Sequence, residues 1–483
     1  MTLRKTLASA AAVTMVAALA ACSPADKDEP SAPPADVGLN LFQWPWTAIE
    51  AECQTIADNG VTWIMTSPPQ EHIQGDAWWT SYQPVSYKLE SKLGTRDEFG
   101  QMVQTCGDAG VDVVADAVVN HMTGQENPGT GTGGTPYEHY DYPGIYSTDD
   151  FHHCDAANGD ITNYQDRNEV QNCELVNLAD LKTESEHVRT TLKAYLDDLL
   201  SLGVAGFRID AAKHMPAEDV AAIVADLPEG TRVIQEVIRA AGEPITPEEY
   251  LEAGDVLEFS WGKDMSSLKV GSTFSAFFNA GTTSAYAPSE KSYTFVENHD
   301  TERGNRAITY KDPQYEVFTA LMLASPYGTP ILYSGYAFAD RDAGPAKNFA
   351  TGQLMDVTCT ERTGPTQTYL DGEWTCQQRW PTLVNMIQWR TDAGDAAVTQ
   401  EWSEEDGLAF ARDGRAFIAV NRGAEPLTGT WNTTLPPGEY CDAGVGEIIT
   451  TCETPTLTVG KDGALTGTIA PYSVLATSVS FRS

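Results

Sequence analysis

The sequence predicts an α/β fold in which a closed (β/α)8 barrel is followed by a smaller all-β domain. From about residue 37, short apolar runs alternate with longer amphipathic stretches, and eight of the runs resemble buried strands. Eight strands that alternate with helices are typical of a (β/α)8 TIM barrel. Beyond about residue 392 short apolar runs are separated by Gly, Pro and Asn, which indicates an antiparallel β-sandwich.

The elements of the barrel follow from these runs. The stretch 185–203 has the apolar spacing of an amphipathic helix and closes with Gly203. We expect the eight strands at 39–42, 61–66, 111–119, 203–210, 231–238, 255–259, 293–298 and 329–334.

One connection breaks this alternation. About 65 residues rich in Gly, Asn, Asp and His separate the third strand from the helix at 185, which is too many for an ordinary loop. We therefore expect a small subdomain inserted after strand three. The predicted boundaries are 37–120 and 186–392 for the barrel, 121–185 for the insertion and 393–483 for the C-terminal sandwich.

The N-terminus has the pattern of an export signal. Arg4 and Lys5 precede an apolar run that is too short and wrongly flanked for a permanent membrane span. The ending LAAC resembles the lipobox of bacterial lipoproteins, which implies a signal peptide at 1–22 and lipidation of Cys22. Residues 23–36 are acidic and rich in Pro, as a flexible linker would be. We expect an extracellular or cell-surface protein that contacts the membrane only through this lipid anchor.

Composition narrows the class of partner. The chain has 483 residues, 41% of them hydrophobic, which is enough for substantial cores. Its formal charge is −38, because it contains 68 Asp and Glu but only 30 Lys and Arg. This excess of negative charge disfavours nucleic acids and anionic membrane surfaces as partners. A neutral or cationic ligand fits better, although solubility alone is the simpler explanation of the acidity. We expect a monomer.

Eight cysteines remain besides Cys22, and an even number in an exported protein favours disulfides over metal thiolates. The sequence alone permits many pairings. Our hypothesis is that neighbours pair within each domain: Cys53 with Cys106, Cys154 with Cys173, Cys359 with Cys376, and Cys441 with Cys452.

The segment GFRIDAAKH, residues 206–214, places charge directly after an apolar run. Buried charge is costly unless it is paired, so Arg208 and Asp210 at alternate positions of a strand end indicate a deliberate arrangement. Taken alone, the segment suits a functional site and a structural ion pair equally well.

Three acids follow predicted barrel strands: Asp210 after strand four, Glu236 after strand five and Asp300 after strand seven. Polar residues at these ends face one mouth of the barrel, so we expect the three to converge. Cleavage of a glycosidic bond requires two carboxylates, one as nucleophile and one as proton donor. Arg208 beside Asp210 would keep that carboxylate ionised.

Four segments, DAVVNH, GFRIDAAKH, QEV and FVENHD, resemble in this order the signature regions of α-amylases in glycoside hydrolase family 13. The similarity runs from about residue 38 to the end, and SPPQEH and WWTSYQPVSYKL make it look closest to the animal-type and actinomycete branch. The resemblance implies retaining endo-hydrolysis of internal α-1,4-glucosidic bonds in starch and glycogen through a covalent glycosyl-enzyme intermediate.

The resemblance also implies roles for single residues. Asp210 would be the nucleophile, Glu236 the acid/base, and Asp300 the third acid that grips sugar hydroxyls and stabilises the oxocarbenium-like state. His121 and His299 would hydrogen-bond the sugar, Arg208 would orient the nucleophile, and Lys213 and His214 would line the leaving-group side.

Trp78, Trp79, Tyr82 and Gln83 form an aromatic and polar cluster after strand two. Aromatic faces stack on the C–H faces of sugars and amides bind their hydroxyls, so a glucan cleft is a natural interpretation. Aromatic residues more often belong to a core, but two adjacent Trp residues cannot both point inward from one strand.

Two ions follow from the same comparison. Asn120, Asp180 and the backbone carbonyls of Gln171 and His214 match the family's structural calcium site, and Cys154 and Cys173 match a disulfide in the same subdomain. Animal-type relatives often bind chloride through residues that match Arg208 and Asn298 and a second basic residue in strand eight. This sequence has Ile331 there, so we expect chloride binding to be weak or absent.

Two other functions compete with an α-amylase. One is a glucan-processing relative that releases a single short product or transfers the glycosyl group to another sugar. The other is a catalytically silent lipoprotein that binds starch for uptake. The intact acid trio argues against the second, because a pure binder has no use for an acid/base at Glu236.

Overall fold

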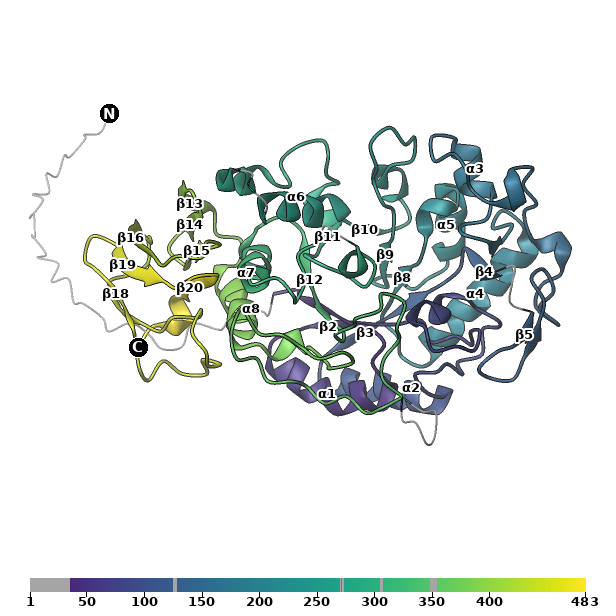
Figure 1. Ribbon diagram of the computed structural model, residues 1–483, viewed down its shortest axis with the longest axis horizontal. Coiled ribbons are helices and arrows are strands. Elements are labelled where there is room, and N and C mark those ends of the chain that lie inside the picture. The colour runs from purple at the N-terminus through teal and green to yellow at the C-terminus, as the bar shows by residue number, and fades with distance from the viewer. Residues whose placement is uncertain (1–34, 125–127, 270, 272, 305–306, 348–353) are drawn as a thin grey trace, which may run out of the picture. The chain divides into compact units, whose positions relative to one another are not determined.

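Eight parallel strands close into a barrel in the order β1, β12, β11, β10, β9, β8, β3, β2 (Figure 1). The computed structural model describes residues 35–483 except 125–127, 270, 272, 305–306 and 348–353, so Cys22 and the predicted signal peptide lie outside the described residues. The closed barrel confirms the predicted fold class. The strands are Gly38–Leu41 (β1), Trp63–Thr66 (β2), Asp112–Ala117 (β3), Gly206–Ile209 (β8), Arg232–Gln235 (β9), Asp255–Leu257 (β10), Ser292–Thr294 (β11) and Thr329–Ser334 (β12).

Helices connect the barrel strands, and side-chain caps fix two of their starts. Thr95 and Glu98 form a capping box at α2, and the Ser185 hydroxyl accepts a hydrogen bond from the Val188 amide at α4, the helix predicted over 185–203. The helices are α1 (Trp46–Asp58), α2 (Arg96–Asp108), α4 (Glu186–Ser201), α5 (Ala217–Val224), α6 (Phe259–Lys269), α7 (Tyr315–Ala324) and α8 (Pro381–Ala393). Short 3-10 turns lie at η1 (Trp78–Tyr82), η2 (Thr148–Asp150), η3 (Ala157–Gly159), η4 (Ala212–His214), η5 (Pro247–Tyr250), η6 (Phe274–Asn279), η7 (Ser289–Lys291), η8 (Thr301–Arg303), η9 (Gln377–Arg379) and η10 (Val479–Phe481).

Close approach of β8 to β9 depends on one glycine. A Cβ built on Gly206 would lie 2.4 Å from the carbonyl oxygen of Arg232 on β9, a separation that real Cβ atoms do not show. Glycine therefore lets the two strands pair in the register that sets Arg208 opposite Ile234. This pairing places the ends of β8 and β9, and the acids that follow them, side by side.

The predicted insertion is a folded segment between β3 and α4. Its strands β4 (His121–Gly124) and β7 (Leu178–Asp180) pair antiparallel, as do β5 (Gly129–Thr130) and β6 (Pro136–Tyr137). A short helix, α3 (Arg167–Asn172), completes it. The β4–β7 pair sets His121 opposite Asp180, so the first and last strands of the insertion meet beside the barrel.

Two four-stranded antiparallel sheets form the C-terminal part, as predicted. Apolar residues from both sheets, among them Phe417, Trp431 and Leu475, share one core, which makes the pair a sandwich. The Trp389 indole of α8 donates a hydrogen bond to the Phe417 carbonyl at 3.0 Å. The strand orders are β13 (Val398–Glu404), β14 (Gly407–Arg412), β15 (Ala416–Asn421), β20 (Ser473–Ser478), and β16 (Leu427–Asn432), β19 (Ala464–Ile469), β18 (Leu457–Val459), β17 (Gly438–Tyr440).

The predicted neighbour pairing of the cysteines is confirmed. Disulfides join Cys53 to Cys106, Cys154 to Cys173, Cys359 to Cys376 and Cys441 to Cys452. The first links α1 to α2. Within the described residues, no helix is both long and apolar enough to cross a bilayer.

Candidate active site

A single buried guanidinium gathers the acids at the barrel mouth. Arg208, 1% exposed, lies on β8 and its Nη1 donates to Asp210 Oδ1 at 2.5 Å, while its Nη2 lies 3.0 Å from Glu236 Oε2. Asp210 follows β8 directly and Glu236 follows β9 directly, as the sequence predicted. Because one guanidinium contacts both carboxylates, the two acid groups face the same small space.

The turn after Asp210 is strained and supports Glu236. Ala211 has the left-handed backbone conformation, with φ 50°, which costs a residue with a side chain about 1–3 kcal/mol. In this conformation the Ala211 amide donates a hydrogen bond to Glu236 Oε2 at 2.9 Å. The strained conformation of Ala211 therefore allows a hydrogen bond that holds Glu236 next to the end of β8.

Asp300 lies further from its strand than predicted. The strand expected at 293–298 ends at Thr294, whose partner in β12 is Pro330, a residue with no N–H to give to a ladder. Asp300 instead precedes the short turn η8, and its amide lies 3.2 Å from Asn298 Oδ1. Its side chain is 42% exposed, so its carboxylate faces the open mouth.

Burial raises the pKa of both buried acids, and the Arg208 guanidinium opposes both rises. Burial raises the pKa of Glu236, the charge of Arg208 opposes this rise, and the charges of Asp210 and Asp300 add to it. For Asp210, burial also raises the pKa, and the Arg208 guanidinium opposes the rise by charge and by its hydrogen bond. The pKa of each acid is therefore raised above its ordinary value, which suits the proton-donor role predicted for Glu236.

Asp116 is a site residue that the sequence reading did not single out. It lies on β3 opposite Arg208, is 2% exposed, and accepts from Arg208 Nη1 at 2.8 Å and from the Tyr82 hydroxyl at 2.9 Å. Asp116 is an acid inside an apolar strand and the first residue of the segment DAVVNH, and both features could have singled it out. The contact with Asp116 holds Arg208 in place, in the position from which its guanidinium contacts Asp210 and Glu236.

The aromatic cluster continues the mouth with residues that follow β1, β2 and β11. The His299 ring stacks between Phe42 and Tyr82 at centroid distances of 4.9 and 5.1 Å, and Trp78 packs edge-on against His299 at 5.7 Å. Burial, followed by the charge of Arg208, lowers the pKa of His299 well below its usual range, so the imidazole is neutral. Trp79 is 37% exposed, in agreement with the expectation that the two Trp residues diverge.

His121 and Gln83 join the aromatic cluster to the insertion. His121 Nε2 hydrogen-bonds the Tyr82 carbonyl at 3.0 Å, and Gln83 Oε1 accepts from the Gly124 amide at 3.0 Å. Burial lowers the pKa of His121 to about 4. Their predicted contacts with sugar hydroxyls stay predictions.

Lys213 and His214 lie on η4, after β8. The Lys213 ammonium pairs with Glu243 and lies 5.6 Å from the centre of the Tyr164 ring. No sequence pattern had pointed to Glu243 or Tyr164. Together these side chains form a charged and aromatic group around Lys213.

Hydrogen bonds bring the residues of the predicted calcium site together in two pairs. Leu181 N donates to the Asn120 carbonyl at 3.0 Å, which sets Asn120 beside Asp180, and His214 Nδ1 hydrogen-bonds the Val170 carbonyl at 3.1 Å, which sets η4 beside α3 and Gln171. Asn120 Oδ1 is buried and has no hydrogen-bond partner among the described residues.

This donor set fits calcium. It offers one carboxylate, one amide oxygen and backbone carbonyls, all of which are oxygen ligands that Ca2+ prefers. No cluster of three His, Cys, Asp or Glu that could hold a metal occurs in the described part of the chain.

The residues predicted for chloride surround very little space. A cavity of about 10 Å3 is lined by Arg208, Asn298 and Ile331 among others, roughly the volume of one water-sized probe. Ile331 contributes only apolar atoms at the position where animal-type relatives have a second basic residue. Weak or absent chloride binding stays a prediction.

Comparisons with known proteins agree with this geometry. Residues 53–260 match the family model described as the alpha amylase catalytic domain, and residues 400–480 match the alpha amylase C-terminal all-beta domain. An alpha-amylase of Streptomyces violaceus is 44% identical over 480 residues, covering 99% of this chain and 79% of the relative. An alpha-amylase of Thermomonospora curvata is 39% identical over 490 residues, covering 97% and 77%.

Solved structures give the same answer. Wild-type alpha-amylase I from Eisenia fetida has a TM-score of 0.85 at 33% identity, covering 93% of this chain and 98% of that chain. A cyclomaltodextrin glucanotransferase with a TM-score of 0.66 is only 19% identical and shares the fold alone. Both folded parts and the acid-bearing barrel mouth are thus accounted for, and the chain belongs to the alpha-amylase family of glycoside hydrolases.

Proposed function

We propose that the protein is an endo-acting α-amylase that hydrolyses internal α-1,4-glucosidic bonds of starch, glycogen and related α-glucans with retention of configuration. The observation that carries this proposal is the contact of one buried guanidinium, that of Arg208, with both Asp210 and Glu236. Retaining enzymes need two carboxyl groups only about 5 Å apart, whereas inverting enzymes leave room for a water between them. A shared arginine favours the shorter separation.

The chemistry divides between the two acids. The Asp210 carboxylate attacks the anomeric carbon while Glu236 gives its proton to the departing glycosidic oxygen, and a covalent glycosyl ester forms. Glu236, now ionised, takes a proton from water, the water oxygen attacks the anomeric carbon from the opposite face, and Asp210 leaves. The two inversions give net retention.

The surrounding side chains bind and orient the glucan. Asp300, exposed at the mouth, would accept hydrogen bonds from sugar hydroxyls and stabilise the positive charge that develops in the transition state. Trp78 and the more exposed Trp79 would stack on sugar faces. Asn120, Asp180 and the carbonyls of Gln171 and His214 would hold calcium, which would join the insertion to the end of β8 and so stiffen the leaving-group side.

Proton NMR of the first products released from amylose tests the proposal. An α-anomer that appears first and then equilibrates, in a mixture of several oligosaccharide lengths, would support retaining endo-hydrolysis. A first-formed β-anomer would exclude retention. A single short product, or glycosyl transfer to added maltose in place of hydrolysis, would favour the glucan-processing alternative.

The same proposal includes export, a monomeric state and a lipid anchor on Cys22. The apolar N-terminal run followed by LAAC supports the anchor. Metabolic labelling with palmitate should mark the wild-type protein and not Cys22→Ser; label that survives the substitution would dismiss the anchor.

A further inference from the structure

Lys92 is a half-buried cation that is bound to the turn η1, which carries Trp78 and Trp79. Its Nζ donates hydrogen bonds to the Ala77 carbonyl at 2.8 Å, to the Thr80 hydroxyl at 2.9 Å and to the Trp78 carbonyl at 3.4 Å. An ammonium group has three donors. All three are therefore used by one short turn and the residue before it.

The backbone of Lys92 is fixed from another direction. Its amide donates a hydrogen bond to His72 Nε2 at 3.1 Å, and His72 Nδ1 lies 2.7 Å from the Ile73 carbonyl. Burial, followed by the charge of Lys92, lowers the pKa of His72 to about 3, so the ring is neutral, with Nε2 accepting and Nδ1 donating. The ammonium thus extends from an anchored backbone, and it can hold η1 in one place.

The turn η1 has few other supports. It is a 3-10 helix of five residues, and Ala77 at its start gives no side-chain cap. The Trp78 indole donates to the Arg341 carbonyl at 3.0 Å, and the Trp78 amide donates to the Asp342 carbonyl. These contacts hold Trp78, whereas the position of the more exposed Trp79 depends on the backbone of the turn, which Lys92 contacts.

The charges around Lys92 leave its ammonium only weakly favoured. Its three hydrogen-bond acceptors are neutral oxygens, and Asp76, the nearby acid, forms an ion pair with Lys347 at 2.5 Å. Burial, followed by the charge of Lys347, lowers the pKa of Lys92 to about 7, and the charge of Asp76 opposes this change. With His72 neutral, Lys92 therefore changes its charge near neutral pH.

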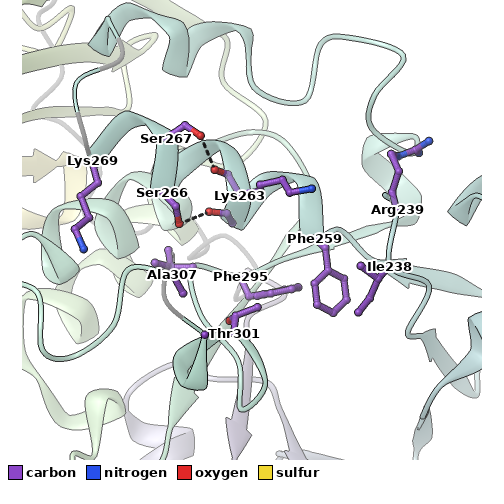
Figure 2. Close-up of a pocket in the computed structure, with 13 residues that line it drawn as sticks. Ile238, Arg239, Phe259, Lys263, Ser266, Ser267, Lys269, Phe295, Thr301 and Ala307 are labelled. Carbon is purple, nitrogen blue, oxygen red and sulfur yellow. Dashed lines mark hydrogen bonds between the residues drawn. The ribbon is translucent and has the colours of Figure 1, made fainter. Parts of the chain in front are cut away.

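The cavity along α6 is a separate feature of the barrel. It has a volume of about 810 Å3 and is lined by Phe259, Lys263 and Thr301 among others (Figure 2). None of its described lining residues belongs to η1 or to residues 91–94. A substitution of Lys92 therefore leaves the lining of this cavity unchanged.

We propose that Lys92 is a positioning residue that holds the turn bearing Trp78 and Trp79 in the conformation that binds the glucan. This proposal rests on the proposed function and deepens it, because it adds a residue that acts through η1 without touching the substrate. A neutral amine has two donors in place of three, and it loses the extra strength of charge-assisted hydrogen bonds. Glucan binding should therefore weaken as the pH rises past neutrality.

Two substitutions of Lys92 test the proposal. Lys92→Met removes the donors but keeps a long side chain, whereas Lys92→Arg keeps a cation at every pH of the assay. Lys88→Met is the matched control, since Lys88 is exposed four positions earlier and its ammonium donates to Thr135 of the insertion at 2.7 Å. Each protein is assayed on amylose, and kcat and KM are measured separately.

At about pH 6, where Lys92 is charged, Lys92→Met should raise KM about tenfold, equivalent to about 1.4 kcal/mol of binding free energy. Its kcat should change by less than about twofold, because the acids are not moved, and Lys88→Met should match the wild type. Lys92→Arg should restore most of the lost affinity. Between about pH 6 and pH 8.5 the KM of the wild type should rise toward that of Lys92→Met, while that of Lys92→Arg stays nearly constant.

A double-mutant cycle with Trp79→Ala tests whether Lys92 acts through the turn. Trp79→Ala alone should raise KM, because it removes the exposed indole. In this background Lys92→Met should add less than about twofold, since residues that act through one contact are not additive. A full tenfold effect in the Trp79→Ala background would overturn the proposal.

Other outcomes would also overturn it. A KM for Lys92→Met close to that of the wild type would mean that the turn holds its place without the cation, and equal changes in kcat and KM would indicate a general structural defect. A rise of KM with pH that is the same in Lys92→Arg and in the wild type would assign the titration to another group. If the wild type does not cleave amylose, the proposed function fails as well, whereas wild-type cleavage with unaltered Lys92 variants removes this proposal alone.

Discussion

Replacing Glu236 with Gln should remove proton transfer and little else. The Gln carbonyl oxygen can still accept the hydrogen bond that the Ala211 amide gives at 2.9 Å, so the side chain keeps its place. Burial is the main cause of the raised pKa of Glu236, and the charge of Asp210 raises it further. Two interacting acids affect each other's pKa, so a neutral Gln at position 236 favours the ionised form of Asp210. The nucleophile therefore stays competent in the variant.

The expected loss is that of general acid catalysis. Positioned proton transfer contributes on the order of 10²–10⁴ in rate, which corresponds to about 3–5 kcal/mol of activation free energy. Amylose should show this whole loss in kcat, since its leaving alkoxide needs a proton. An aryl maltoside with an acidic phenol should lose much less in its first step, because the phenolate departs unprotonated.

A stopped-flow assay separates these steps. With the aryl substrate, Glu236→Gln should release one equivalent of phenol in a burst and then turn over slowly, since the glycosyl ester on Asp210 lacks a base for its hydrolysis. Glu229→Gln is the matched control, because Glu229 is exposed before β9 at the other end of the barrel. Equal losses on amylose and the aryl substrate without a burst, or lost affinity for insoluble starch, would refute the assignment.

Three further perturbations have directions fixed by the structure. Asp300→Asn should move the basic limb of the kcat/KM–pH profile to lower pH. The reason is that the charge of Asp300, together with burial and the charge of Asp210, raises the pKa of Glu236. A basic limb that stays in place or moves to higher pH would contradict this. EDTA should lower the melting temperature measured by calorimetry, since calcium at about 100 times its Kd would stabilise by about 2.7 kcal/mol, and Asn120→Ala should abolish the EDTA effect; a wild type indifferent to EDTA would count against the calcium site. Joint replacement of Cys53 and Cys106 by Ser should lower the free energy of unfolding in urea by about 4 kcal/mol in the chain-entropy model, as the bridge closes 53 residues of chain; an unchanged midpoint would mean that the bridge contributes nothing.

The acids next to short strands were predictable because they depend on local pattern. Asp210 and Glu236 directly follow β8 and β9, and runs of apolar residues announced both strands. The sequence identified Asp300 as a candidate but did not predict its distance from the strand. Residues 295 and 296 are apolar and continue the strand pattern, although the hydrogen-bonded strand ends at Thr294. A sequence pattern reports burial, and buried residues need not be paired in a sheet.

Several site residues depend on partners far along the chain, and no local pattern identifies those partners. Asp116 gains its role only from Arg208, 92 positions later and opposite it in the β3–β8 register. Glu243 contributes to the site through its ion pair with Lys213. Each of these features depends on a contact between two residues, and a single sequence does not show which residues are in contact.

The sequence by itself determined the alternation of strands and helices, the export signal's pattern, the cysteine count and the residues that follow each strand. These are consequences of hydrophobic periodicity and residue chemistry, which act over a few positions. Only the tertiary structure decided how the barrel closes, and with it the shared arginine, the stacked His299 and the positions of the oxygens predicted to bind calcium. Closure brings together groups that are distant in the chain, and burial then gives their charges and hydrogen bonds the strength that water would otherwise screen.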